Sequence, residues 1–194
     1  MTEKSSQERD YLPGLGKHYL MPFYDVLHRV SGLHAVHRQM VEVAGPGAGH
    51  RVLDIGCGTG NLLRTTGKRH RDVELVGVDP DLKMLARAER KLRRAGLKVR
   101  LDRGFAQELA FPDASFDRVF SSLMLHHLDG ESKGEMLAEV RRVLKPGGLL
   151  VLADIAHHGH VAHGIAAAGF TVEPTRTRRL RMFGDVGIEV AKVH

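Results

Sequence analysis

The chain has 194 residues, of which 42% are hydrophobic and 27% charged, a composition typical of one globular domain with a full core. Its single cysteine, Cys57, excludes an internal disulfide and a zinc site built from cysteines alone. No apolar stretch approaches the ~20 residues of a membrane span, and the polar first residues show no leader pattern, so we expect a cytoplasmic protein. The net charge of +6 can attract nucleic acid or an anionic substrate, but it can also serve solubility alone, which we favour. Trp is absent and other aromatics are few, so a nucleic-acid partner is disfavoured.

Helical and strand patterns alternate along most of the chain. Residues 1–18 are expected to form a flexible terminus, and residues 19–47 a helical cap that ends at Gly45-Pro46-Gly47. Apolar runs predict five strands, at 51–54, 73–78, 97–101, 116–121 and 149–153. Apolar residues at helical spacing predict helices at 62–69, 82–92 and 136–144.

The order of these elements predicts the fold. Continuously apolar strands that alternate with helices are typical of a doubly wound, Rossmann-like α/β sheet whose strands are mostly parallel. Two further strands, at 170–177 and 186–193, are joined by a turn at 183–185 and must therefore run antiparallel. We expect one domain over residues 19–194, with a seven-stranded sheet closed by this hairpin.

A glycine-rich loop follows the first strand, in the motif VLDIGCGTG (52–60). Glycines there allow a sharp turn and let a ligand approach the main chain, and ligands of such sheets bind at the carboxyl ends of the strands. A dinucleotide fingerprint needs Gly or Ala at its sixth position, where this chain has Asn61. The spacing therefore disfavours a nicotinamide cofactor.

Asp79 ends the second strand, nineteen residues after Gly60. A carboxylate at this point can accept hydrogen bonds from both hydroxyls of a ribose. The alternative is that Asp79 only caps the following helix, with Pro80 in its first turn. The glycine loop upstream favours the ribose interpretation.

Four motifs occur in order along the chain: VLDIGCGTG, VGVDPD, LAFPDASFDRVFSSLMLHHL and VLKPGGLLVLADI. Together they resemble the class I S-adenosylmethionine-dependent methyltransferases, in particular the ubiquinone- and menaquinone-biosynthesis-like (methyltransferase type 11) group. The resemblance covers residues 19–155 and, more loosely, the terminal hairpin. It implies S-adenosylmethionine as the cofactor, a small-molecule acceptor, and methyl transfer by in-line displacement.

The resemblance also implies a role for each cofactor-site residue. The methionine end would be held by Asp54 and by the loop residues Gly56, Cys57, Gly58 and Gly60. Asp79 would bind the ribose, Pro80 and Ala106 would contact the adenine, and Ser121 would lie near the sulfonium. Phe105 departs from the family, which usually has a polar residue there. The bond to the adenine amino group is then missing, or an aromatic contact replaces it.

His126 and His127 follow the fourth strand, at the end where ligands bind. Imidazole titrates near neutral pH, so either residue could accept a proton from an acceptor hydroxyl. The alternative is that one of them packs at the sheet edge. A quinone O-methyltransferase branch has carboxylate metal ligands in this stretch, but the matching positions here are Leu123 and His126, so we expect no metal.

Two further clusters could serve the acceptor side. The four histidines His157, His158, His160 and His163 follow the fifth strand and could bind a transition metal, or they could belong to a solvated loop. Tyr24 and Asp25 resemble a pair in the quinone-type group, but that segment could equally pack an aromatic face on the sheet.

Three functions stay open on the sequence alone. A small-molecule methyltransferase is the main hypothesis. A nucleic-acid methyltransferase is the second, although no motif for methylating base amino groups follows the fourth strand. A non-catalytic S-adenosylmethionine-binding protein that acts through a partner is the third. A nicotinamide oxidoreductase is the most distant alternative.

Overall fold

The computed structural model describes residues 32–155, 160–180 and 182–193. The expected flexible terminus at 1–18, the pair Tyr24 and Asp25, and His157 and His158 lie outside these residues. Up to residue 143, the described elements are, in chain order, α2 (Leu33–Ala44), β1 (Arg51–Ile55), α3 (Asn61–Arg69), β2 (Glu74–Asp79), α4 (Leu82–Arg94), β3 (Val99–Arg103), β4 (Phe116–Ser122), η2 (Leu125–His127) and α5 (Gly130–Val143). The chain then continues with β5 (Leu144–Ile155), α6 (His160–Ala167), β6 (Thr171–Val172), β7 (Arg176–Leu180) and β8 (Gly184–Lys192).

All described strands belong to one sheet, in the order β3-β2-β1-β4-β5-β8-β6, with β7 also paired to β8. The first five run parallel, and β8 runs antiparallel to β5. The predicted parallel α/β core with an antiparallel C-terminal end is therefore confirmed. In this order β1 lies between β2 and β4, so the residues that follow these three strands meet at one edge of the sheet.

The outer strand differs from its prediction. The single strand expected at 170–177 is interrupted, and both pieces, β6 and β7, pair with the same edge of β8. Pro174 lies in the gap and has no backbone N–H to donate to the ladder. Because of this interruption the sheet has eight strands rather than seven.

The starts of β8 and β5 also differ from the predicted strand boundaries. β8 already begins at Gly184, which pairs with Leu180, so the predicted turn at 183–185 lies too late in the chain. β5 begins at Leu144 rather than at residue 149, because Leu144 pairs with Phe116 before the bulge. The Gly147 N–H also donates to the carbonyl of Val193, 3.0 Å away.

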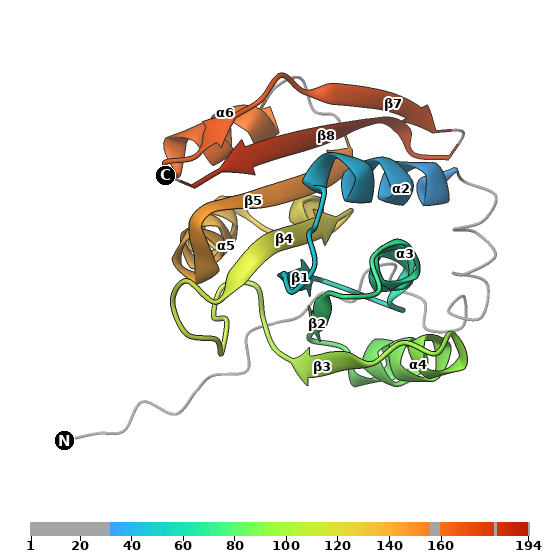
Figure 1. Ribbon diagram of the computed structural model, residues 1–194. Helices are drawn as coiled ribbons and strands as arrows, with labels where there is room; N and C mark the ends of the chain where they lie inside the picture. Colours follow the sequence, from blue (N-terminus) through green and yellow to red (C-terminus); the bar gives the residue numbers. More distant parts are fainter. Residues whose placement is uncertain (1–31, 156–159, 181, 194) are drawn as a thin grey trace, which may run out of the picture.

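Helices cover both faces of the sheet, as Figure 1 shows. Apolar side chains of α2, α3 and α4 form one core layer, whereas those of α5 and α6 join the core on the opposite face. On α4, for example, Leu85, Ala88 and Leu92 recur at helical spacing and are buried. Burying a leucine completely contributes roughly 1.5–3 kcal/mol, so these faces fix each helix on the sheet.

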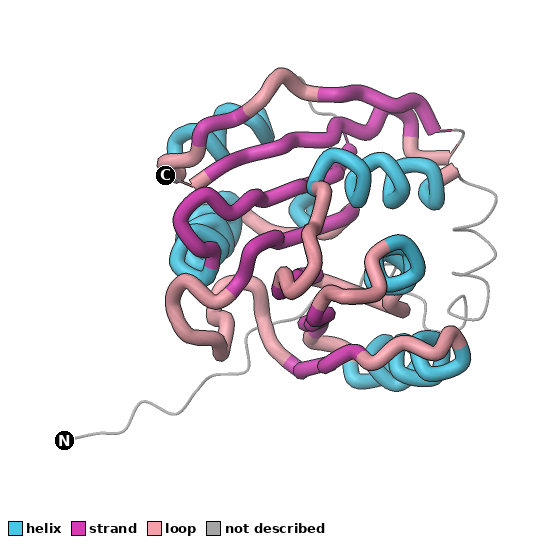
Figure 2. Tube along the Cα trace, viewed as in Figure 1, coloured by secondary structure: helices cyan, strands magenta, loops and turns pink. Residues whose placement is uncertain are grey.

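The connection between β3 and β4 is a loop rather than a helix, as Figure 2 shows. It still contributes to the core, because Leu109 and Phe111 are buried beneath α5. Over the described part of the chain, no helix is long and apolar enough to cross a membrane.

Candidate functional site

The glycine loop turns sharply between β1 and α3. The Gly56 and Cys57 N–H groups both donate to the carbonyl of Val78, at 2.8 and 3.0 Å, which ties the loop to β2. Gly56 has a φ of +68°, and a Cβ there would lie 2.6 Å from Cγ of Met124. Both the turn and the close approach of the chain after β4 therefore require glycine at this position.

Asp79 fixes the tip of the same loop. Its Oδ2 accepts a hydrogen bond from the Gly58 N–H at 2.8 Å, and its Oδ1 accepts one from the Asp81 N–H at 2.9 Å. The cap of α4 is Asp81, which accepts from the N–H groups of Lys83 and Met84. The alternative that Asp79 serves only as the helix cap is therefore wrong.

Two buried carboxylates lie together at this point. Burial, with the Asp79 carboxylate nearby, raises the pKa of Asp54 well above its usual range. Burial also raises the pKa of Asp79, although the N–H groups of Asp81 and Gly58 oppose that shift. Burying two like charges is costly unless a cation compensates them. The pair therefore favours a cationic ligand.

Helix α4 holds the loop from outside. The Lys91 ammonium donates to Oγ1 of Thr59 and to Oδ1 of Asn61, each at 2.8 Å. A Cβ on Gly60 would lie 3.1 and 3.2 Å from side-chain atoms of Leu92 and Ala88, so α4 packs tightly on the loop here. The sequence did not reveal Lys91, because it belongs to a run of basic residues that is typical of a solvated face.

A cavity opens beneath the glycine loop. Its lining includes Asp54, residues 56–59, Asn61 and, from other parts of the chain, Leu33, His37, Ser122 and Leu123. His37 is buried, and its Nε2 lies 3.1 Å from Oγ of Ser122. Sequence reasoning missed both residues. The available signal was a histidine between apolar residues on the inner face of a predicted helix.

Ser121 occupies a different position from Ser122. It is fully buried, it pairs in register with Ile55, and its Oγ has no hydrogen-bond partner in the described part of the protein. The serine that lines the cavity is its neighbour, Ser122. Cys57 also lines the cavity, and burial raises the pKa of its thiol well above the usual range.

The residues expected around the adenine follow β2 and β3. The Pro80 carbonyl accepts a hydrogen bond from Nε of Arg103 at 3.3 Å, which links the ends of these strands. Ala106 is buried, while Phe105 is partly exposed and forms an isolated bridge with Glu108. Phe105 thus lies at the carboxyl edge of the sheet, beside the strand that ends in Asp79.

His126 is held by a buried carboxylate at the end of β5. Its Nδ1 lies 2.6 Å from Oδ1 of Asp154, and its backbone N–H donates to Oδ2 at 3.0 Å. The Ile155 N–H also donates to Oδ1, at 2.7 Å. Because the carboxylate faces Nδ1, it favours the tautomer with the proton there and leaves Nε2 able to accept a proton. Sequence reasoning missed Asp154, although it ends an apolar strand as Asp79 does.

His127 lies beside His126, with ring centroids 4.0 Å apart. Burial and the neighbouring His126 lower the pKa of His127, and Asp154 only partly opposes this shift. His127 is therefore neutral near pH 7. Among the residues that the structure describes, no carboxylate is hydrogen-bonded to its ring as Asp154 is to that of His126, so the two histidines are not equivalent.

Residues 52–148 match the family model described as a methyltransferase domain. The chain belongs to this family. The match begins in β1 and ends in β5, so it includes the glycine loop, Asp79 and both histidines of η2.

Relatives and solved structures agree with this assignment. The chain is 37% identical over 138 residues to a demethylmenaquinone methyltransferase of Deinococcus radiodurans, which covers 70% of this chain and 56% of the relative. It is 37% identical over 109 residues to a 27-O-demethylrifamycin SV methyltransferase of Amycolatopsis mediterranei, covering 55% and 39%. It therefore spans about half the length of such relatives. A SAM-dependent methyltransferase from Aquifex aeolicus has the same fold, with a TM-score of 0.70, 22% identity, and coverage of 86% and 93%.

The structure gives no support for a metal in this methyltransferase domain. Within residues 32–155, 160–180 and 182–193, no three His, Cys, Asp or Glu side chains group closely enough to hold an ion. Of the histidine cluster after β5, His160 begins α6 and His163 is exposed. Whether the cluster binds a metal stays a hypothesis.

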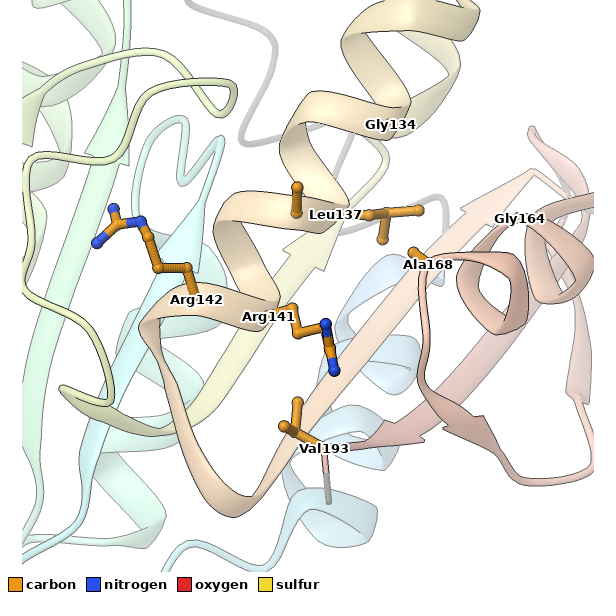
Figure 3. A pocket seen from close by; sticks show the side chains of 8 residues that line it. Gly134, Leu137, Arg141, Arg142, Gly164, Ala168 and Val193 are labelled. Carbon is orange, nitrogen blue, oxygen red and sulfur yellow. The ribbon is translucent and has the colours of Figure 1, made fainter.

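A second groove lies elsewhere, between α5 and α6, with a volume of about 540 Å³. Figure 3 shows Arg141 pointing along it toward Val193, while the neighbouring Arg142 points away. Arg142 binds Glu139 and Asp113. Because α5 leads from here directly into the start of β5, this groove lies toward the amino edge of the parallel strands. It is therefore separate from the cavity beneath the glycine loop.

Proposed function

We propose that this domain transfers a methyl group from S-adenosylmethionine to a small molecule with an ionisable hydroxyl or comparable acidic proton. The proposal rests on two features that lie at the same edge of the sheet. Two buried carboxylates, Asp54 and Asp79, lie next to the glycine loop, and a carboxylate-oriented histidine, His126, follows β4. The first feature suits a cationic nucleoside cofactor, and the second suits proton transfer.

The residues present fit the cofactor. S-adenosylmethionine carries an ammonium and a sulfonium, which would compensate the buried negative charge of Asp54. The carboxylate of Asp79 uses two of its roughly four acceptor positions on Gly58 and Asp81, so capacity remains for two ribose hydroxyls. Gly58 has a φ of +52°, and no atom of the described residues lies within 4 Å of a Cβ built there, so a ligand can approach the backbone. We assign Pro80, Phe105 and Ala106 to the adenine and Ser122, with Ser121 behind it, to the reacting end.

His126 is the proposed catalytic residue. When bound, S-adenosylmethionine supplies an electrophilic methyl group on its sulfonium. The chain must then hold the acceptor oxygen in line with this group and remove its proton. In the proposed step, Nε2 of His126 takes this proton, so that the acceptor oxygen could accept the methyl group that a bound cofactor would supply, leaving S-adenosylhomocysteine. Asp154 positions the ring and stabilises the resulting imidazolium.

His127 is assigned a supporting role, because a lowered pKa weakens it as a base at neutral pH. The small-molecule acceptor is supported by the relatives, whose names specify a demethylmenaquinone and a 27-O-demethylrifamycin as substrates. Of the helical cap expected at residues 19–47, residues 19–31 lie outside the described part of the chain. We further propose that the described part, α2, covers the acceptor side, since it brings His37 into the cavity. The lone buried Cys57 is consistent with a cytoplasmic location.

The test combines binding and turnover. Isothermal titration with S-adenosylmethionine and S-adenosylhomocysteine measures cofactor affinity, and mass spectrometry of a panel of phenols, hydroquinones and macrocyclic alcohols detects methylated products. We expect His126→Gln to keep its cofactor affinity and lose about 10²–10⁴-fold in kcat. The matched variant His127→Gln should lose less than tenfold.

Three outcomes would contradict the proposal. Absence of cofactor binding by the folded protein would remove the methyltransferase activity. Binding without turnover on any acceptor would favour a non-catalytic role through a partner. Full activity of His126→Gln would show that the acceptor needs no protein base.

A further inference from the structure

The charge of this domain is concentrated on one layer of helices. Helices α2, α3 and α4 together carry ten Lys or Arg residues and two Glu residues, a net charge of +8. The whole chain has a net charge of +6, so everything outside these three helices sums to −2. The excess charge of the protein is therefore a property of one face.

Helix α5, on the opposite face, shows how the same chain builds a balanced solvated helix. It has three basic and three acidic residues, and Arg142 pairs with Glu139 at 2.7 Å. On α4 the ion pair between Arg93 and Glu89 is longer, at 3.8 Å, and both side chains are exposed. Like charges on one face repel one another and lower stability. An unbalanced layer beside a balanced one therefore indicates a partner of opposite charge.

Apart from Arg93, which pairs with Glu89, the exposed basic residues of this layer are Arg38, Lys68, Arg69, Lys83, Arg90 and Arg94, and we call these six the basic face. Within the described residues, none of the six forms an ion pair. The three helices lie side by side on one side of the sheet, as Figure 1 shows, with α2 packed on α3 and α3 on α4. The pKa of His34, on α2, is lowered by burial and, in addition, by the positive charges of the nearby Arg38, Arg69 and Arg64.

We propose that the basic face docks the protein on an anionic phospholipid bilayer. Each Lys or Arg near such a surface contributes about 1 kcal/mol, or about fivefold in partitioning, and mobile lipids can gather under side chains spread over three helices. Leu82 opens α4 beside Lys83 and is 58% exposed, so it can enter the boundary of the acyl chains. No Phe, Tyr or Trp among the described residues is exposed. This disfavours the stacking of nucleic-acid bases on the same face.

Docking on a bilayer does not depend on which reaction the domain catalyses. Its test measures sedimentation of the full chain with vesicles of phosphatidylcholine alone, and of phosphatidylcholine with about one third phosphatidylglycerol, at an ionic strength of about 0.15 M. We expect binding only to the anionic vesicles, and its loss at about 1 M salt, where charges are screened within a few ångströms.

Matched variants separate the face from overall charge. The triple variant Lys68→Gln, Arg90→Gln and Arg94→Gln should bind about 100-fold more weakly. The control Lys133→Gln, Arg141→Gln and Lys192→Gln removes the same charge elsewhere and should lose less than fivefold. Leu82→Ser should weaken vesicle binding several-fold. All variants should keep the melting temperature and the affinity for S-adenosylhomocysteine.

Three results would overturn the proposal. The first is no binding to anionic vesicles at low salt by the folded protein. The second is equal loss in both triple variants, which would mean that net charge alone matters. The third is tighter binding to single-stranded or duplex RNA than to vesicles, measured by fluorescence anisotropy at the same salt. In that case the face recognises nucleic acid instead.

Discussion

The two halves of the site are built on different principles. The proposed cofactor half consists of a glycine turn, backbone N–H groups and two buried carboxylates on adjacent strands. The acceptor half relies on side-chain pairs that join separate parts of the chain, His126 with Asp154 and His37 with Ser122, the latter 85 residues apart. The cofactor half is therefore fixed by the fold itself, whereas single substitutions can alter the acceptor half without disturbing the sheet.

This difference predicts how each half responds to mutation. Residues of the cofactor half should control binding of S-adenosylmethionine and the stability of the unliganded protein. Residues of the acceptor half should control turnover and leave cofactor affinity unchanged. Each of the following substitutions tests one side of that division.

The largest effect is expected at Asp79. Asp79→Ala removes the acceptor for the Gly58 and Asp81 N–H groups together with the proposed ribose contact, so affinity for S-adenosylhomocysteine should fall about 100-fold or more. Asp79→Asn keeps one acceptor and should lose about tenfold. The control Asp102→Ala, which removes a carboxylate from the adjacent β3, should leave affinity within twofold. Isothermal titration measures these affinities. Near-native affinity of the folded Asp79→Ala protein would contradict the ribose assignment.

The second effect belongs to the acceptor half. Asp154→Asn keeps the size of the side chain but no longer favours the proton on Nδ1 of His126, so kcat should fall about 10- to 100-fold. The affinity for S-adenosylhomocysteine should not change. A merely structural role would lower the melting temperature without altering the pH dependence of kcat. A shifted pH profile at an unchanged melting temperature therefore identifies a positioning residue.

How far the sequence predicts the molecule follows the same division. The five parallel strands, the antiparallel end and the glycine loop with Asp79 were predicted, because each depends on local pattern or on motif spacing. Asp154, His37 and Ser122 were missed, because their proximity arises only when β4, β5 and α2 pack together. The outer strand was predicted as continuous, although Pro174 interrupts its ladder. The choice between His126 and His127 could not be made until Asp154 was placed.

A substitution of Lys91 tests whether a residue outside the glycine motif also contributes to cofactor binding. Lys91→Met keeps most of the aliphatic stem but removes the bonds to Thr59 and Asn61, so the glycine loop should be held less firmly. We expect affinity for S-adenosylhomocysteine to fall about three- to tenfold, the size of a single charge-assisted hydrogen bond acting indirectly. The neighbouring Arg90→Met, on the exposed side of α4, should have no effect. Equal affinities of the two variants would show that packing alone fixes the loop.

The smallest effect is expected in stability, at Asp54. Its pKa in the folded protein is raised well above the ordinary value of about 3.8, because the side chain is buried near Asp79. The folded state therefore holds the proton more tightly than the unfolded state, and Asp54 costs stability increasingly as pH rises from about 3.8 toward its folded pKa. Asp54→Asn removes this cost. We expect the unliganded variant to melt about 2–4 °C higher at pH 8, which corresponds to roughly 1 kcal/mol, with a smaller gain at pH 5.

The matched comparison is Asp117, whose shift has the opposite sign. Although burial opposes it, the Lys145 ammonium and the Arg51 N–H lower the pKa of Asp117, so its contribution is present above about 3.8 and is lost as pH falls. Asp117→Asn should therefore lower the melting temperature at pH 8. Asp54→Asn should at the same time weaken binding of S-adenosylmethionine, since the buried charge that destabilises the empty site is the one that attracts the cation. A variant that lost stability at pH 8, or kept full affinity, would show that Asp54 does not have this electrostatic role.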